Sequence, residues 1–269
     1  LVRGSSLDGM AVRFRVGALN QPVDWILEKQ IACEVETVKP PREPSESFIK
    51  VMKKIPFSVS SSDREAIRDY LNKRHVTSLY HFTRMSNLSS IMKYGLMPRR
   101  MLEAQQIPFA FNDPKRLDNA VDAISVSISF PNDKLFYKFR KDKPGERWVV
   151  LEIKPEVLWT FPCAFCAENA ASNLIRFRPL QERMNLNALI ELFTEPRTRL
   201  GLTLPDSYPT SSQAEVLVFG VIPVNAILTV NVDSQGDLEK LQQMGSGVKW
   251  RWDSLLFLQR FIPLNLKGN

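Results

Sequence analysis

Strict alternation of apolar and polar residues over residues 122–130 constrains the fold more than any other stretch of this sequence. The segment reads Asp-Ala-Ile-Ser-Val-Ser-Ile-Ser-Phe, so an extended chain would turn its aliphatic side chains one way and its serines the other. A period of two residues is that of a β-strand with one buried face. We therefore expect a half-buried strand here, a second strand at residues 148–153 and a third at residues 78–83.

Helices are expected between these strands. Residues 87–94 place leucine, isoleucine and methionine at helical spacing, and Gly95 is positioned to end that helix. Serines and an aspartate at residues 60–63 are typical of a helix start. Residues 64–74 are therefore predicted to form a helix that leads into the core.

The first part of the chain is expected to differ from the rest. Residues 1–9 resemble a remnant of an expression vector, and we expect the native chain to begin at Met10. Residues 10–76 are predicted to form an N-terminal extension whose role the sequence does not reveal. Within it, residues 39–45 carry three prolines, which lack backbone donors and favour extended neighbours, so we expect a linker there.

The balance of charge bears on the partner. The 269 residues carry 36 lysines and arginines against 29 aspartates and glutamates, a net charge of +7. Such an excess favours a polyanionic partner over an acidic protein or a neutral ligand. The longest apolar stretches fall well short of the roughly 20 residues that span a bilayer, so no membrane is expected as a partner.

Three cysteines, an odd number, argue against a disulfide framework and favour a reducing, cytoplasmic setting. Cys163 and Cys166 have C-x-x-C spacing, but a zinc site needs two further ligands. The remaining candidates Cys33, His75 and His81 are not paired at metal spacing, so we expect no metal. The glycine pattern of a Rossmann cofactor site is also missing.

The pair Gln213 and Glu215 is the clearest indication of chemistry. It lies in residues 211–218, Ser-Ser-Gln-Ala-Glu-Val-Leu-Val, where we expect an apolar strand whose alternation puts both side chains on one face. A carboxylate beside a neutral amide can hold a ribose hydroxyl and stabilise positive charge on the sugar, as paired carboxylates do in glycoside cleavage. The alternative is a solvated carboxylate at a strand edge.

A histidine, a threonine and an asparagine form a second candidate group. In Tyr-His-Phe-Thr at residues 80–83, alternation puts His81 and Thr83 on one face, and the following helix brings Asn87 near them. His81 can hold a hydroxyl or an amide of a ligand. Alternatively, it is a structural histidine with a satisfied hydrogen bond.

Two further segments complete the set of candidates. Arg116 lies in the charged turn at residues 112–118 and can grip a pyrophosphate with two hydrogen bonds or stabilise a developing anion, unless the turn is only solvated surface. Residues 166–172, Cys-Ala-Glu-Asn-Ala-Ala-Ser, have side chains small enough to let their backbone approach another group closely.

Taken together, these segments resemble the DarT family of DNA ADP-ribosyltransferase toxins. The resemblance rests on Tyr-His-x-Thr, Asn-Leu-x-x-Ile, Gly-Leu, Arg-Leu-Asp, Asn-Ala-Ala-Ser and Ala-Glu-Val-Leu-Val, in this order over residues 78–229. It implies an α+β, ADP-ribosyltransferase-like fold in which two small, mostly antiparallel sheets form an NAD cleft with flanking helices. Residues 77–269 would form this domain, with NAD as co-substrate and no metal.

The resemblance also implies roles for the candidates. Four residues would bind NAD or support its pocket, the first two at the nicotinamide end and its ribose: His81, Thr83, Asn87 and Gln213. Glu215 would be the catalytic glutamate, and Arg116 a catalytic or phosphate-contacting arginine. The family pattern expects a tyrosine or serine on the second core strand, and three serines there qualify equally: Ser125, Ser127 and Ser129.

The implied acceptor is a base in single-stranded DNA, in agreement with the basic composition. The enzyme would be the toxin of a toxin–antitoxin or phage-defence pair with a macrodomain antitoxin, and residues 200–212 would lie against the target base. The residues expected along the strand are Arg99, Arg100, Lys115, Lys138, Arg140, Lys141, Arg197 and Arg199, with Tyr137, Phe193 and Tyr208 as stacking surfaces. Two alternatives stay open: transfer to RNA or protein, and a non-catalytic module that binds nucleic acid.

Overall fold

The computed structural model describes residues 2–3, 13–14, 61–111, 121–194, 199, 201, 203–242 and 247–260. The chain divides into two compact units, residues 1–47 and residues 48–269. In the first unit, β1 (Val2–Arg3) and β2 (Arg13–Phe14) pair antiparallel. The linker expected at residues 39–45 lies outside the described residues.

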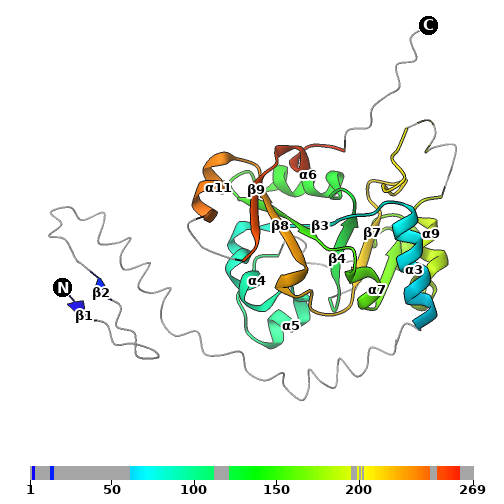
Figure 1. Ribbon diagram of the computed structural model, residues 1–269, viewed down its shortest axis with the longest axis horizontal. Coiled ribbons are helices and arrows are strands. Elements are labelled where there is room, and N and C mark those ends of the chain that lie inside the picture. The colour runs from blue at the N-terminus through cyan, green and yellow to red at the C-terminus, as the bar shows by residue number, and fades with distance from the viewer. Residues whose placement is uncertain are drawn as a thin grey trace, which may run out of the picture. The chain divides into compact units, whose positions relative to one another are not determined.

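A seven-stranded sheet organises the second unit (Figure 1). Its strands are β3 (Leu79–Arg84), β4 (Ile124–Ile128), β5 (Trp148–Ile153), β6 (Cys163–Cys166), β7 (Glu215–Val218), β8 (Ile227–Val232) and β9 (Lys249–Trp252). Across the sheet they follow the order β6-β7-β4-β3-β5-β8-β9, and every pair is antiparallel except β8 with β9. Strands that are far apart in sequence, such as β4 and β7, are therefore neighbours.

The join between β3 and β4 is short. Its registered pairs are Leu79 with Ile128 and Tyr80 with Ser127, whereas β3 pairs with β5 along its whole length. The strand order nevertheless runs unbroken from β6 to β9. The α+β class is confirmed, but the expected division into two small sheets is not, because this join connects the two halves into one sheet.

The two faces of the sheet meet different surroundings. On one face, Val126, Phe165 and Val216 belong to the main hydrophobic core. Ser125 lies opposite Leu217 on the other face, because successive residues of a strand point to opposite sides. Ser125 is half-buried, so the alternation that predicts this strand separates two enclosed faces rather than a core and bulk solvent.

Helices pack on both sides of the sheet. They are α3 (Ser61–Lys73), α4 (Leu88–Tyr94), α5 (Arg99–Ala104), α6 (Asp133–Asp142), α7 (Val157–Thr160), α8 (Asn173–Arg176), α9 (Leu186–Glu191) and α11 (Gln235–Gln242), with 3-10 turns η1 (Met85–Asn87), η2 (Gln181–Arg183), η3 (Val224–Ala226) and η4 (Ser254–Phe257). Helix α3 contacts α7 and α9, and its Ile67 and Leu71 are buried in the main core. The helix that precedes β3 is thus part of the packing of this unit.

Gly95 ends α4 in a conformation that suits glycine. Its φ is +82°, and a Cβ at this position would lie 2.6 Å from the main-chain oxygen of Ile222. Leu96 then forms a bridge with Ile222. The predicted helix end is confirmed, and the close backbone contact requires the glycine as much as the turn does.

Helix α6 begins at a capping residue and packs through aromatic contacts. The side chain of Asn132 accepts a hydrogen bond from the N–H of Leu135 at 3.1 Å. Phe136 is 1% exposed, stacks on Phe82 of β3 with ring centroids 4.5 Å apart, and meets Trp148 of β5 edge-on. These contacts hold α6 against β3 and β5, on the side opposite to the main core.

The strands and the helix that local sequence patterns predict are observed in the structure. The strands expected at residues 78–83, 122–130 and 148–153 are observed as β3, β4 and β5, and the helix expected at residues 64–74 is observed as α3. Among the described residues, no helix is long and apolar enough to cross a membrane. A separate extension over residues 10–76 stays a prediction.

Candidate active site

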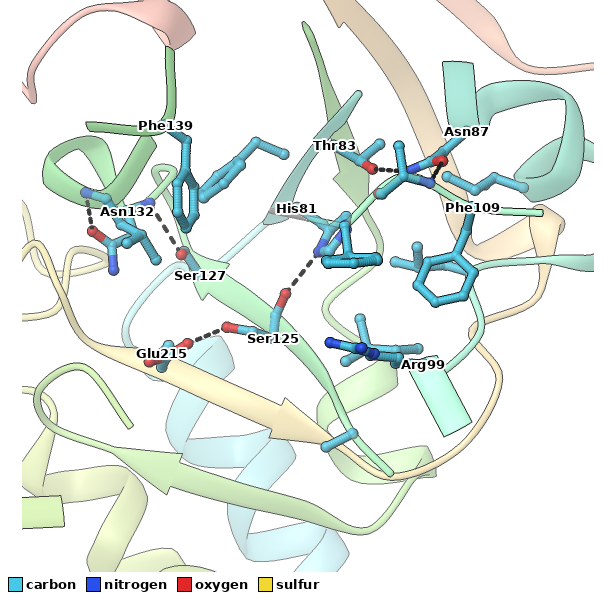
Figure 2. Close-up of a pocket in the computed structure, with 18 of the residues that line it drawn as sticks. His81, Thr83, Asn87, Arg99, Phe109, Ser125, Ser127, Asn132, Phe139 and Glu215 are labelled. Carbon is cyan, nitrogen blue, oxygen red and sulfur yellow. Dashed lines mark hydrogen bonds between the residues drawn. The ribbon is translucent and has the colours of Figure 1, made fainter. Parts of the chain in front are cut away.

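A cavity of about 570 Å³ opens beside the short join between β3 and β4. Strand β3 contributes His81 and Thr83 to its lining. Strand β4 contributes Ser125 and Ser127, β7 contributes Glu215, and α4, α5 and α6 complete the wall. Figure 2 shows how these side chains lie around the cavity. The volume is within the range of sites that hold a small-molecule ligand.

Glu215 is the buried carboxylate of this cavity. It is the first residue of β7 and is only 6% exposed. Its Oε2 accepts a hydrogen bond from the hydroxyl of Ser125, and its Oε1 accepts one from the main-chain N–H of Ala170. Because Ser125 is paired with Leu217, the contact with Glu215 runs diagonally across two strands. Two donors therefore fix the orientation of the carboxylate.

The loop after β6 supplies the second donor. Asn169 and Ala171 line the cavity on either side of Ala170, and Asn169 Oδ1 accepts a hydrogen bond from the N–H of Ala171 at 2.8 Å. The sequence predicts that small residues here let the backbone approach another group. This is confirmed, and the group approached is Glu215.

His81 is held by the backbone of β4. Its Nδ1 lies 2.8 Å from the main-chain oxygen of Ser125. A carbonyl oxygen only accepts hydrogen bonds, so Nδ1 carries the proton and Nε2 is an acceptor in the neutral ring. This bond connects β3 to β4 beyond their last registered pair, Tyr80 with Ser127.

Asn87 ties β3 to the segment that follows α5. Its amide nitrogen donates to Thr83 Oγ1 at 2.9 Å and to the main-chain oxygen of Ala110 at 2.8 Å. Its Oδ1 accepts a hydrogen bond from the N–H of Ala110 at 2.7 Å. The predicted proximity of Asn87 and Thr83 is confirmed, and the amide shapes the cavity through bonds inside the protein.

Aromatic side chains form the apolar part of the wall, which the sequence patterns do not single out. The rings of Phe109 and Phe111 lie 5.8 Å apart, and the guanidinium of Arg99 lies 4.5 Å from the ring of Phe111. Tyr80 lines the cavity from β3, and burial, followed by the charge of Glu152, raises its pKa to about 12. Its phenol is therefore uncharged at physiological pH.

Two residues that the sequence predicts for the site, Gln213 and Arg116, are not among the described residues that line the cavity. Gln213 lies in the turn before β7 and is not among the described residues that line the cavity. The expectation that Gln213 and Glu215 share a strand face is wrong, because β7 begins only at Glu215. Arg116 lies outside the described residues, so its role and that of Gln213 stay predictions. Ser125, by contrast, is the serine that reaches the carboxylate.

Some residues expected along the DNA path are engaged inside the protein instead. Arg199 donates hydrogen bonds to main-chain oxygens, among them that of Tyr208 at 2.6 Å. Arg140 forms an ion pair with Asp233 at 2.8 Å. Phe193 is 3% exposed and lies in the main core, so the expectation that it offers a stacking surface is wrong.

Other residues of the expected path lie close to the cavity. Arg99 and Lys138 line it. Arg100 forms an ion pair at 3.0 Å with Asp122, which lies just before β4. Lys115 and Arg197 lie outside the described residues.

The two cysteines of the C-x-x-C pair are free thiols buried in β6. Burial raises the pKa of the Cys163 thiol well above its usual value. Cys166 lies opposite Glu215 in register and accepts a hydrogen bond from the buried Arg183 at 3.3 Å. In the part of the chain that the structure describes, no group of three or more His, Cys, Asp or Glu side chains converges as metal ligands would.

The fold is similar to that of solved DarT structures. Thermosipho africanus DarTG in complex with ADP-ribose gives a TM-score of 0.51 at 16% identity, over 70% of this chain and 52% of that chain. Thermus sp. 2.9 DarT gives TM-scores of 0.45 in complex with NAD+ and 0.47 in complex with ADP-ribosylated ssDNA. Those matches have 17% and 18% identity and cover 68% and 67% of this chain and 98% and 96% of the other. The chain thus spans about half the length of the Thermosipho africanus chain.

The sequence itself gives the family. A family model described as ssDNA thymidine ADP-ribosyltransferase, DarT, matches residues 80–255, which is more than half of the chain. The chain therefore belongs to the DarT family, and the matched range contains both His81 and Glu215. A comparison with curated protein sequences found no match.

Proposed function

We propose that this protein transfers ADP-ribose from NAD to thymidine in single-stranded DNA. One observation carries the proposal: Glu215 is a buried carboxylate whose two oxygens are held by Ser125 and Ala170 at the wall of a ligand-sized cavity. The family, described as ssDNA thymidine ADP-ribosyltransferase, supports the reaction class and the acceptor.

The described residues fit NAD. Aromatic rings such as Phe109 give the cavity an apolar wall, and a few polar groups lie at defined places on it, as is typical of ligand sites. We assign His81 and the Thr83 hydroxyl to the nicotinamide end and its ribose, with Asn87 holding Thr83 in place. NAD supplies the ADP-ribosyl group and nicotinamide as the leaving group.

Glu215 acts at the ribose that carries nicotinamide. Loss of nicotinamide leaves positive charge on this sugar, and a carboxylate that is already oriented stabilises the charge without reorganising. If a ring nitrogen of the base attacks, it must also lose its proton, because in thymidine the one ring nitrogen that is not bonded to the sugar carries a hydrogen. Glu215 accepts this proton. Arg116 is our candidate for contacting the phosphates or stabilising the transition state.

We further propose that residues 77–269 form the transferase domain and that a macrodomain antitoxin reverses the mark. An ADP-ribosyl group on the pairing edge of thymine would block base pairing, so a toxin–antitoxin or phage-defence pair is the setting that we propose. One structural relative is the Thermosipho africanus DarTG, solved in complex with ADP-ribose.

The test is incubation of the protein with NAD and a panel of single-stranded DNA, RNA and protein acceptors, followed by mass spectrometry. We expect the mass of one ADP-ribose unit to be added only to DNA that contains thymidine, and the addition to disappear in Glu215→Gln. NAD consumption without a modified nucleic acid would contradict the proposed acceptor and point to a protein acceptor or to hydrolysis. If NAD is not consumed at all, the result would support the alternative in which the protein binds nucleic acid without catalysing a reaction.

A further inference from the structure

Helix α6 borders the active-site cavity with one side and presents lysines on another. Leu135, Lys138 and Phe139 line the cavity, and Phe136 is buried against β3 and β5. Lys134, Tyr137, Lys138 and Lys141 are all exposed, and their spacing of three and four residues puts them on one helical face. We call these four residues the α6 lysine face.

The lysines of this face have no acidic partners within the described chain, whereas nearby arginines do. Arg140 pairs with Asp233 at 2.8 Å and Arg147 with Asp237 at 2.9 Å, but none of the three lysine ammonium groups pairs with a carboxylate of the described residues. Like charges three and four residues apart on a helix repel one another. The α6 lysine face is therefore a site where an added anion lowers the energy of the protein.

A second hollow continues the surface past the end of α6. It has a volume of about 700 Å³, and Tyr137, Lys141 and Lys143 are among its lining residues. Lys143 lines the active-site cavity as well. Asp142 is the one exposed carboxylate at this end of the helix that has no ion pair within the described chain. Asp142 therefore interrupts the positive charge between the cavity and the hollow, whereas the other carboxylates that line the hollow are ion-paired with arginines.

We propose that the α6 lysine face binds the phosphates of the DNA strand next to the target base, with Tyr137 as a stacking surface for a neighbouring base. This inference rests on the proposed function. Lys134 and Lys141 are about 10 Å apart along the helix axis, a distance over which a single strand presents more than one phosphate. Tyr137 is 56% exposed, and an exposed aromatic ring between cations is the arrangement that binds single strands.

Single-stranded DNA fits this face better than the phosphates of NAD. Lys134, Tyr137 and Lys141 lie outside the lining of the active-site cavity, so they cannot reach a ligand that is enclosed there. A polyanion that enters the cavity with one base must instead leave its flanking phosphates on the surface around the opening. The α6 lysine face is a basic surface that adjoins the cavity through Lys138.

The test compares two double variants that remove the same charge. Lys134→Gln/Lys141→Gln changes the α6 lysine face without touching the cavity, and Lys240→Gln/Lys249→Gln changes exposed lysines of α11 and β9. We measure binding of a long thymidine-containing strand at several salt concentrations, and transfer to that strand and to the nucleoside thymidine, which carries no phosphate. Tyr137→Ala is measured in the same way.

For the α6 variant, we expect the Kd and KM for the long strand to rise about tenfold, and the slope of log Kd against log salt to fall by about 1.4, since two phosphate contacts are lost. The KM for NAD and transfer to the nucleoside should match those of the wild type. The α11/β9 variant should behave like the wild type. Tyr137→Ala should raise the Kd for the long strand about tenfold.

The inference would be overturned if the two double variants bind the long strand with the same Kd and the same salt dependence. The α6 lysine face would then bind an acidic partner other than DNA. An equal loss with the nucleoside and with NAD would also overturn it, because the lysines would then act on the fold or the cavity. Binding is measured without turnover, so the inference is tested even when the wild type transfers nothing to DNA. A wild-type protein that binds DNA but transfers no ADP-ribose to it would contradict only the proposed function.

Discussion

His81 and Glu215 contact the same residue, Ser125, from the two strands on either side of it. The imidazole of His81 binds the main-chain oxygen of Ser125 at 2.8 Å, and the hydroxyl of Ser125 donates to the carboxylate of Glu215. The histidine assigned to the nicotinamide end and the carboxylate assigned to the sugar are thereby held in a fixed relation. Ser125 is the residue through which the two halves of the site are coupled.

Replacement of Glu215 by glutamine should abolish transfer and leave the fold intact. Glutamine keeps the volume of the side chain, and its oxygen can still accept a hydrogen bond from Ser125 or Ala170, but it carries no charge. We expect kcat to fall about 100-fold or more, with an unchanged urea midpoint. Transfer at the wild-type rate would contradict the catalytic role of Glu215.

Loss of the Ser125 hydroxyl should slow the chemical step. Ser125→Ala removes one of the two donors that orient Glu215, so we expect kcat to fall about 10- to 100-fold while the KM for NAD changes little. Ser125→Thr keeps a hydroxyl on a residue that favours strands and should retain most of the activity. If Ser125→Ala and Ser125→Thr have equal activity, the hydroxyl does not position the carboxylate.

Asn87→Ala should weaken both stability and NAD binding. The variant leaves the N–H and the main-chain oxygen of Ala110 without their partner and releases Thr83. We expect the free energy of unfolding to fall by about 1–3 kcal/mol and the KM for NAD to rise. Asn72→Ala, on the exposed side of α3, is the matched control and should change neither quantity.

The stability of the folded protein should fall between pH 10 and pH 12, in part because of Tyr80. Its pKa is raised from 10.0 to about 12 in the folded state, so in this interval the unfolded chain loses the phenolic proton while the folded chain keeps it. The folded state then binds more protons, and stability decreases as the pH rises. Tyr80→Phe should lose stability less steeply over the same interval, as measured by urea denaturation. Parallel curves for the two proteins would refute the raised pKa.

Gly95→Ala should destabilise the protein, whereas Gly145→Ala should not. At Gly95, φ is +82° and a Cβ would lie 2.6 Å from the oxygen of Ile222, while a Cβ at Gly145 meets no atom within 4 Å. We expect Gly95→Ala to lower the free energy of unfolding by about 2 kcal/mol or more. Because Gly95 also lines the cavity, the KM for NAD should rise. Thermal unfolding of both variants provides the comparison.

Local sequence patterns predict much of this fold because short-range physics determines them. The alternation at residues 122–130 and the glycine at the end of α4 act within a few residues, and both predictions are confirmed. Local patterns do not predict that the strands form a single sheet. Two registered pairs, Leu79 with Ile128 and Tyr80 with Ser127, decide whether there are one or two sheets, and no local pattern encodes how far two strands stay together.

The candidate site could be predicted only where a residue type is itself distinctive. Glu215 and His81 attract notice as a carboxylate and a histidine beside apolar strands. Ser125 is one of three alternating serines, and only the diagonal contact with β7 distinguishes it. The prediction for Gln213 assumes that the strand already includes this residue, but β7 begins two residues later, at Glu215. Phe109 carries no periodic signal at all.

The position of β7 in the sheet has a consequence for protein synthesis. This strand lies between β4 and β6, although the ribosome makes both of them first. The contact between Ser125 and Glu215 spans 90 positions of the chain. A nascent chain that stops before Glu215 has neither the carboxylate nor the strand that joins β4 to β6. Translation must therefore pass Glu215 before the proposed transferase activity can exist, and chains that stop earlier would not modify DNA.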